Sequence, residues 1–353
     1  MAIELNETRV KPLNKLKTAQ DLKNHYESLK RGRQNLEAQW KLNIAFYKGK
    51  QYTYYDRATR RILRLPTEDG EKPRYVVRVV NNQIVTGAHA LLAKFTKTKP
   101  VMNATPASGS EADCRAAQVA DKLLRHWWHT FHLDDKLAEA LLWSIVTGNG
   151  YWYIRWDPEA GDSVMRFLLD PQGNPITDTL LADLFRQELL KQGVIPQETV
   201  VMMGDIRVDV PAPFDVYLDD AARVFDDCRY VIIDHYLSPE EIKDKYGLEV
   251  KPDAHINEPE TLFPFGGGAT SEKNVKTVHC GIFKPQAALP NGRYVVWIDD
   301  KIVEDSPWPY PFEALPIVKF PGVRVPGSIY DILVVDRAIP IQEDSNNMFF
   351  HLV

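Results

Sequence analysis

The sequence predicts an α+β fold, with helices concentrated in the first half and strands gathered mainly in the second. Apolar residues recur at helical spacing in four segments before residue 150, whereas short strand-like segments separated by turn signals dominate after it. Helices and strands that occupy separate parts of a chain favour small antiparallel sheets. The 353 residues are enough for two or three domains, and 44% hydrophobic with 26% charged residues is ordinary globular composition.

A long amphipathic helix is predicted from Thr18 to Tyr47. Thr18 and Asp21 form a capping-box pattern, and apolar residues follow at helical spacing, namely Leu22, Tyr26, Leu29, Leu36 and Trp40. A hairpin-like region with a strand at 75–80 comes next. A second helix then begins at Asn81 and ends before Pro100.

Two further helices precede the first long strand. Ser110 caps the third helix, whose predicted buried face consists of Ala116, Val119, Leu123, Trp127 and Phe131. The fourth helix starts at Asp134 and is ended by Gly148-Asn149-Gly150, after which the aromatic segment 151–156 predicts a strand.

The second half is predicted to be mainly β. A helix is expected at 179–191, a short helix at 238–247 and a linker at 252–274. Pro290-Asn291-Gly292 is a hairpin turn signal between two of the expected strands. The strand segments are 200–217, 229–236, 275–284, 294–298, 301–304 and 315–320.

The last segment predicts a helix that needs a partner. It begins after Gly327-Ser328, Pro340 is expected to kink it, and it runs to Val353 through the apolar residues Met348, Phe349, Phe350 and Leu352. Without a glycine cap, and with an apolar end, this helix is a poor surface for a monomer. We expect it to pack against another subunit, and we interpret Val353 as an interruption of the helix.

Composition excludes several classes. The longest apolar runs are too short for a membrane span, the N-terminus lacks the apolar core of a secretory signal, and the three cysteines form no CxxC pair. Residues 1–64 carry 15 Lys and Arg against six Asp and Glu, whereas the remainder carries 28 against 42. An acidic body of this kind does not indicate a sequence-specific DNA-binding protein.

Signatures of common enzymes are missing, because the sequence contains no Walker A, GxSxG, HExxH or GxGxxG motif in a suitable context. Two clusters remain as metal-site candidates. One is the helical series His126, His129 and His132, and the other consists of Asp219, Asp220, Asp226 and Asp227. The aspartate cluster leaves a metal-dependent nuclease open as an alternative function, although we favour a solvated acidic loop.

Several segments, in order along the chain, resemble phage portal proteins, especially those of short-tailed phages. The segments are Trp40-x2-Asn43-x2-Phe46-Tyr47-x-Gly49-x-Gln51, Asn81-Asn82-x-Ile84, Pro100 to Pro106, Asp113 to Trp128, Ala140 to Trp156-Asp157, Phe214 to Asp219, Leu315 to Val318, and Ile339-Pro340-Ile341-Gln342-x3-Asn346. Each match alone is weak, and their common order is what carries the resemblance. A different ring component, such as an adaptor, remains an alternative.

The resemblance implies a non-enzymatic subunit of a homo-oligomeric ring of about twelve copies at one vertex of a phage capsid. Such a ring is the channel for packaging and ejection of double-stranded DNA, requires no cofactor, and contacts terminase, adaptor or tail proteins, the major capsid protein and a scaffold protein. The implied location is the head-tail junction of the virion, after assembly in the host cytoplasm. The implied domains are a wing at 1–235, a first stem helix and linker at 236–274, a β-rich clip at 275–326 and a second stem helix at 327–353.

Six residues are candidates for contacts in such a ring. Lys319 and Arg324 are candidates for facing the DNA channel, with ion pairing to a neighbouring carboxylate as the alternative. The candidates for the subunit interface are Tyr294, Trp297, Phe349 and Phe350. For Tyr294 and Trp297, packing in the core is the simpler alternative.

Overall fold

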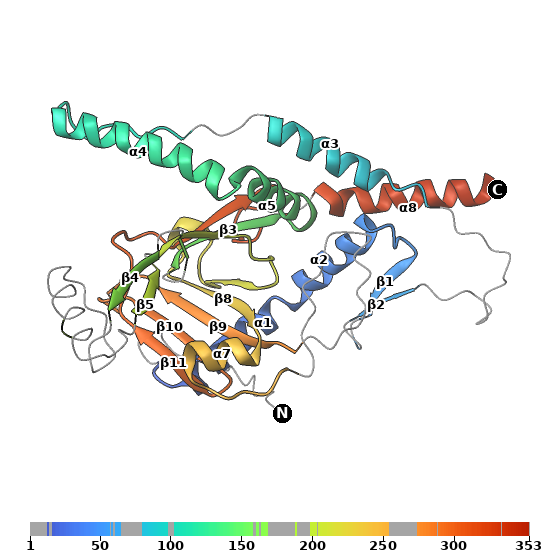
Figure 1. Ribbon diagram of the computed structural model, residues 1–353. Helices are drawn as coiled ribbons and strands as arrows, with labels where there is room; N and C mark the ends of the chain where they lie inside the picture. The colour runs from blue at the N-terminus through green and yellow to red at the C-terminus, as the bar shows by residue number, and fades with distance from the viewer. Residues whose placement is uncertain are drawn as a thin grey trace. The chain divides into compact units, whose positions relative to one another are not determined.

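The computed structural model has the mixed helix and antiparallel-sheet composition of an α+β protein (Figure 1). It describes residues 13, 16–56, 58, 61–64, 80–97, 102–157, 160–161, 164–168, 188, 198–202, 204–253, 274–287, 289–332 and 334–352. The chain forms two compact units, one of residues 1–152 with 210–353 and one of residues 153–209. The strand predicted at 75–80, the helix predicted at 179–191 and the linker predicted at 252–274 lie outside the described residues, apart from residues 80, 188, 252, 253 and 274.

An antiparallel five-stranded sheet organises the first unit, with strand order β11-β10-β9-β8-β7. The strands are β7 Val216–Leu218, β8 Tyr230–Leu237, β9 Lys276–Phe283, β10 Arg293–Ile298 and β11 Lys301–Ser306. Helix α1, Ala19–Gly32, contributes to the same core through a cluster that contains Leu22, Tyr26, Leu29, Ile232, Phe283 and Trp297. Because β8 pairs with β9, the sheet includes strands from both the predicted wing and the predicted clip. The two compact units also have other boundaries than the predicted domains.

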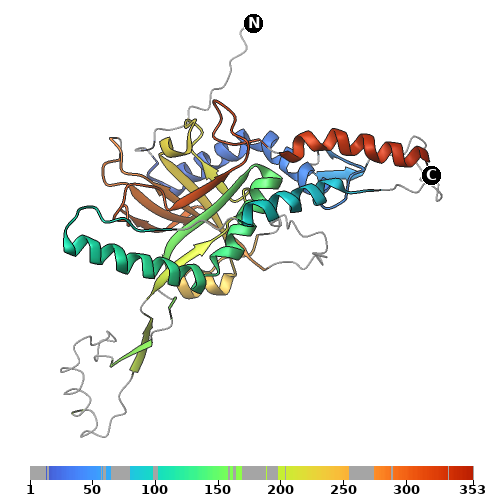
Figure 2. The same cartoon turned by 90° about the horizontal axis from the view of Figure 1, so that it is seen from above.

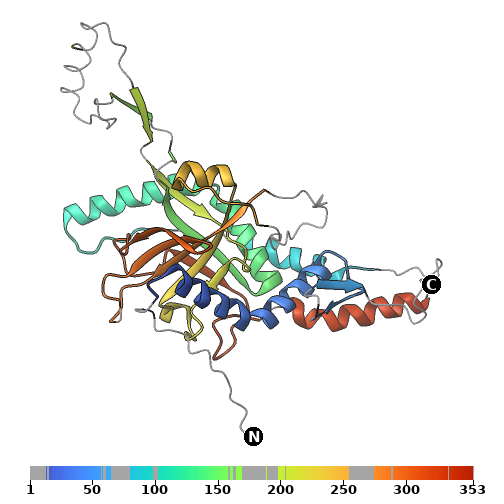
Figure 3. The same ribbon diagram turned by 90° about the horizontal axis from the view of Figure 1, so that it is seen from below.

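The single long helix predicted over 18–47 is wrong, because the structure has two helices there. Helix α1 ends at Gly32, and α2, Gln34–Tyr47, begins after Arg33 (Figure 3). The buried Arg33 side chain donates hydrogen bonds to the carbonyl oxygens of Pro213, Phe214 and Val216. This anchor lies at the break, and periodicity does not reveal it because apolar spacing continues through both helices.

Helices α2, α3, α5 and α8 pack together in the first unit (Figure 1). Their bounds are α3 Gln83–Lys97, α5 Leu133–Thr147 and α8 Val334–Leu352. One apolar cluster joins α2, α3 and α5 through Ile44, Ala88 and Ile145, and another joins α2, α3 and α8 through Phe46, Ile84 and Ile339. Pro340 lies inside α8, as predicted. None of the helices within the described residues has the length and apolar character needed to cross a bilayer.

The predicted glycine turn after the fourth helix is confirmed. Gly148 has φ +80°, and the backbone then enters β3, Asn149–Asp157. A Cβ atom at Gly150 would lie 2.0 Å from the Ala140 carbonyl oxygen, so this close approach of strand to helix requires glycine. Strand β12, Ile317–Pro321, pairs with β3 in the first unit, and the Gly322 N–H donates to the Gly148 carbonyl at 2.9 Å.

Helix α4, Glu111–Thr130, has the predicted position but not the predicted buried face. None of its 20 residues is buried, and Val119 and Leu123 are 57% and 43% exposed. Among the described helices α4 contacts α5, while α3 and α8 lie on the other side of α5 (Figure 2). The predicted apolar face of α4 is present, but nothing else in the described chain covers it.

Smaller elements complete the two units. In the first unit, β1 Thr53–Asp56 pairs with β2 Arg61–Arg64, and α7 Pro239–Tyr246 ends at Gly247 as predicted. In the second unit, the end of β3 pairs with β6 Asp205–Asp209, and β4 Val164–Leu168 pairs with β5 Glu198–Met202.

A buried carboxyl group beside the large sheet predicts a measurable pH dependence. Burial, reinforced by the nearby Asp234, raises the pKa of Asp215 to about 6, although the Tyr236 hydroxyl donates to it at 2.7 Å. The native state therefore binds more protons than the unfolded state between pH 4 and 6, so stability falls as the pH rises through this range. Asp215→Asn keeps the acceptor for Tyr236 and is expected to be more stable than the wild type by about 3 kcal/mol at pH 7 and about equal to it near pH 3.

Urea unfolding of both proteins between pH 3 and 7 measures this difference. The exposed Asp226→Asn is the matched control and is expected to change stability by less than about 0.5 kcal/mol. A pH-independent difference for Asp215→Asn would contradict the assignment of this carboxyl.

Candidate functional site

Amide side chains from three distant parts of the chain meet where α2, α3 and α8 come together. The Asn346 side chain donates to Gln51 Oε1 at 2.6 Å, and the Gln342 side chain donates to Asn346 Oδ1 at 3.0 Å. Gln342 Nε2 also donates to the Asn81 carbonyl at 2.7 Å, while Gln342 Oε1 accepts from the Gln83 N–H at 2.9 Å. Gln51, Gln342 and Asn346 are all buried. We call this set of five residues the amide network.

The network satisfies backbone groups that helix ends leave unpaired. Gln51 Nε2 donates to the carbonyl of Phe46 in the last turn of α2. Asn82 bridges two helices, since its side-chain nitrogen donates to the Tyr47 carbonyl at 2.9 Å and its oxygen accepts from the Val85 N–H at 3.3 Å. The end of α2 and the start of α3 are therefore capped by amide side chains, one of which, Gln342, comes from α8.

The amide network consists largely of residues that carry the portal resemblance. Gln51, Asn81, Gln342 and Asn346 belong to three of the quoted segments, which are separated by up to 295 positions in the chain. The sequence indicated their order but not their contact. It missed Gln83, which takes part through its backbone N–H, and the link from Gln39 Nε2 to Asp336 Oδ1 at 2.9 Å.

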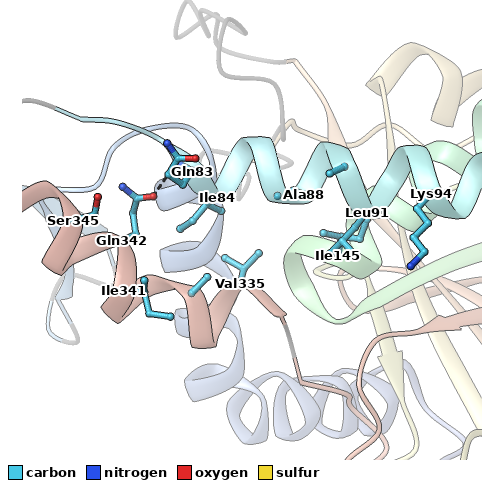
Figure 4. A pocket seen from close by; sticks show the side chains of 13 residues that line it. Gln83, Ile84, Ala88, Leu91, Lys94, Ile145, Val335, Ile341, Gln342 and Ser345 are labelled. Carbon is cyan, nitrogen blue, oxygen red and sulfur yellow. Dashed lines mark hydrogen bonds between the residues drawn. The ribbon is translucent and has the colours of Figure 1, made fainter.

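An apolar groove of about 540 Å³ lies beside the network, between α3 and α8 (Figure 4). Gln83 and Gln342 lie at one end of it and Lys94 at the other. The remaining lining residues are mostly apolar and include Ile84, Gly87, Ala88, Ala90, Leu91, Ile145, Val335, Ala338 and Ile341. We call this feature the α3–α8 groove.

Helix α8 exposes large apolar side chains beside the groove. Ile341 and Met348, seven residues apart and so on one face of the helix, are 72% and 67% exposed. The predicted need of this helix for a partner is consistent with that exposure. Phe349 and Phe350 continue α8, but their side chains lie outside the described residues, so their interface role stays a prediction.

The two channel candidates line the same pocket but differ in their exposure. The Lys319 side chain is 8% exposed, and its ammonium group lies 2.8 Å from the buried Asp331 carboxylate of the same chain. Burial lowers the pKa of Lys319, and Asp331 partly offsets this effect. The structure therefore gives Lys319 an ion-pair partner within its own chain, and its channel-facing role stays a prediction. The alternative, an ion pair with a carboxylate, is present, and the partner Asp331 belongs to the same chain as Lys319.

Arg324 is exposed and keeps its place as a candidate contact for a polyanion. It lines a pocket of about 530 Å³ together with Arg223, which is also exposed and which sequence reasoning missed. A single arginine in a loop gives little signal in a sequence. Only the fold brings Arg223 and Arg324, about a hundred positions apart, to the same pocket.

The two aromatic candidates on β10, Trp297 and Tyr294, differ in how deeply they are buried. Trp297 is fully buried in the core of the sheet, and its ring stacks on His279 at a centroid distance of 5.2 Å. Its interface assignment is therefore replaced by core packing, the simpler alternative. Tyr294 is half-buried, and burial together with Cys280 raises the pKa of its hydroxyl.

The two metal-site candidates do not assemble. Among the described residues, no group of three or more His, Cys, Asp and Glu side chains is placed so that it could hold a metal ion. Asp219 is fully buried and accepts hydrogen bonds from Arg229 Nε at 2.6 Å and Nη2 at 2.8 Å, so its carboxylate oxygens are engaged by a guanidinium group. Although burial raises it, these bonds hold the pKa of Asp219 below its usual range. This arrangement is typical of a structural ion pair.

No protein-family model matches this chain, and no curated protein matches it. A functional proposal is therefore supported by the motifs and by the contacts of the described residues.

Proposed function

We propose that this chain is a subunit of a phage portal, the ring at one capsid vertex through which double-stranded DNA enters and leaves. The observation that carries the proposal is the amide network, because it unites three of the segments that resemble portal proteins around three buried amide side chains. Segments that match a family in order and also contact one another are a stronger argument than isolated matches.

The charge distribution also supports a conduit. Residues 65–353 carry 28 Lys and Arg against 42 Asp and Glu, so the body is acidic. A channel for a polyanion works best with few fixed phosphate contacts, because each tight ionic contact would have to be broken as the DNA moves. Arg324 and Arg223 are the proposed cationic contacts, and terminase and adaptor or tail proteins are the proposed partners of the assembled ring.

Exposed apolar surface supports an oligomer. Val119 and Leu123 on α4, Phe95 on α3, and Ile341 and Met348 on α8 are large apolar side chains with at least 43% exposure. Surfaces of this kind on several helices of one unit are typical of interaction sites. A ring in which each copy meets two neighbours would cover surfaces on both sides of α5.

The mass of the purified full chain tests this proposal. Native mass spectrometry is expected to show closed assemblies of about twelve copies, and negative-stain images are expected to show a flanged ring with a central channel. A flat ring would indicate an adaptor. A monomer that cleaves DNA with magnesium, and loses this activity in Asp219→Ala, would overturn the proposal in favour of the nuclease.

A further inference from the structure

Helix α4 presents an exposed stripe with a regular spacing. Its members are three to four positions apart and are all exposed, namely Ala112, Ala116, Val119, Leu123, His126 and Thr130. This alternation of four and three is the spacing with which one helix packs lengthwise against others. No residue of α4 is buried, so the described chain leaves this packing surface uncovered. We call it the α4 stripe.

The α3–α8 groove has a floor with the same spacing. The exposed residues of α3 that line it are Gln83, Gly87, Ala90 and Lys94, again four, three and four positions apart. The distance from Gln83 to Lys94 spans eleven residues, as does the distance from Ala112 to Leu123, and each corresponds to about 17 Å of helix. The stripe and the floor therefore match in length and in period.

Size and charge favour one orientation. If α4 runs antiparallel to α3, Val119 faces Gly87, where a Cβ atom would meet nothing within 4 Å, so a large side chain enters open space. The same orientation brings the acidic first turn of α4, with Asp113, near Lys94. It also brings the exposed Lys122 near the exposed Asp344, which lies three residues after Ile341 on the same face of α8. Opposite charges thus meet at both ends of the groove.

We propose that the α4 stripe of one copy docks into the α3–α8 groove of a second copy of this chain. The partner is another copy because stripe and groove complement each other in length, period and charge, and because they lie on different sides of α5. This inference rests on the proposed ring and names the contact that builds it. A stripe-to-groove contact uses two different surfaces, so each copy docks head to tail with the next, as ring closure requires.

Two variants test the contact without disturbing the core. Leu123→Asp places a charge on the exposed stripe, and Gly87→Trp fills the groove at an exposed position where space is open. Each is expected to lower the yield of rings by about tenfold or more, because a charge or a clash would be buried in an apolar contact. Circular dichroism and unfolding midpoints are expected to stay near those of the wild type, because both sites are exposed.

Gln118→Asp is the matched control on α4. Gln118 is exposed, but as the neighbour of Val119 it points about 100° away from the stripe around the helix axis. This variant is expected to assemble like the wild type. On α8, Asp344→Lys is expected to weaken assembly and to be rescued by Lys122→Glu in the same chain. The exposed neighbour Glu343→Lys, two residues from Ile341 and thus on the opposite face, is expected to have no effect.

Mixing the two defective variants gives the decisive result. Leu123→Asp keeps an intact groove and Gly87→Trp keeps an intact stripe, so an equimolar mixture is expected to form one-to-one dimers that grow no further. Native mass spectrometry would detect these dimers, and their absence would overturn the proposal. Rings that form despite both variants would overturn this contact and leave the portal proposal standing, whereas a wild-type chain that stays monomeric would overturn both.

Discussion

Arg33→Met is expected to lower the free energy of unfolding by about 3–5 kcal/mol. Arg33 is only 4% exposed and donates to the carbonyl oxygens of Pro213, Phe214 and Val216, and to the Glu37 carboxylate at 2.9 Å. Methionine fills much of the same volume but donates nothing. The variant therefore leaves three carbonyl groups and a largely buried carboxylate without their donor.

The position of Arg33 adds to this effect. Its guanidinium group lies 3.9 Å from the centroid of the Tyr217 ring and 5.5 Å from that of Trp40, so the side chain also joins α2 to β7 through cation–π contacts. Denaturant unfolding with an unchanged m-value would measure the loss. Arg31→Met, on the exposed last turn of α1, is the matched control and is expected to change stability by less than about 0.5 kcal/mol. Equal effects of the two variants would show that Arg33 is not an anchor.

Gln342→Leu is the second large prediction, with an expected loss of about 2–4 kcal/mol. Gln342 makes three hydrogen bonds in the amide network, and leucine makes none of them. The Asn346 side chain would lose a partner in a buried place, and the Asn81 carbonyl and the Gln83 N–H would lose theirs in partly buried places. Glu343→Leu, the next residue along α8 and an exposed one, makes the same kind of polar-to-apolar change and is expected to alter stability little.

A double-mutant cycle separates the network from its members. Asn346→Leu alone is expected to be destabilising, because Gln51 Oε1 and Gln342 then lose their partner. The double variant Gln342→Leu with Asn346→Leu is expected to cost less than the sum of the two single changes, since part of the penalty in each single variant comes from the amide left behind. Strict additivity in urea unfolding would mean that the amides act independently.

Local signals in the sequence predicted the ends of most described elements. Thr18 and Ser238 form capping boxes in the structure, and Gly148 and Gly247 end their helices with positive φ. These predictions succeeded because a cap depends on residues within one turn of each other. The hairpin at Asn291-Gly292 is confirmed for the same reason, since β9 and β10 pair on either side of it.

Predictions that depended on distant contacts were less successful. The stripe of Val119 and Leu123 was assigned to the core, but it is exposed, because periodicity shows that a face is apolar and not what covers it. For Lys319 and Trp297 the sequence left two alternatives open, and the structure shows Lys319 paired with Asp331 and Trp297 packed in the core. The role of Arg33 was missed altogether, since its partners are backbone carbonyls 180 or more positions away.

The sequence by itself determined the α+β class, the order of its elements, and the series of segments that resemble portal proteins. These features reside in local propensity, spacing and caps, which act over a few residues. Only the tertiary structure decided that Gln51, Asn81, Gln83, Gln342 and Asn346 form one hydrogen-bonded network and that α3 and α8 enclose a groove, while the α4 stripe remains uncovered. The physical reason is that burial and hydrogen-bond pairing belong to residues brought together across the chain, and folding alone sets which residues these are.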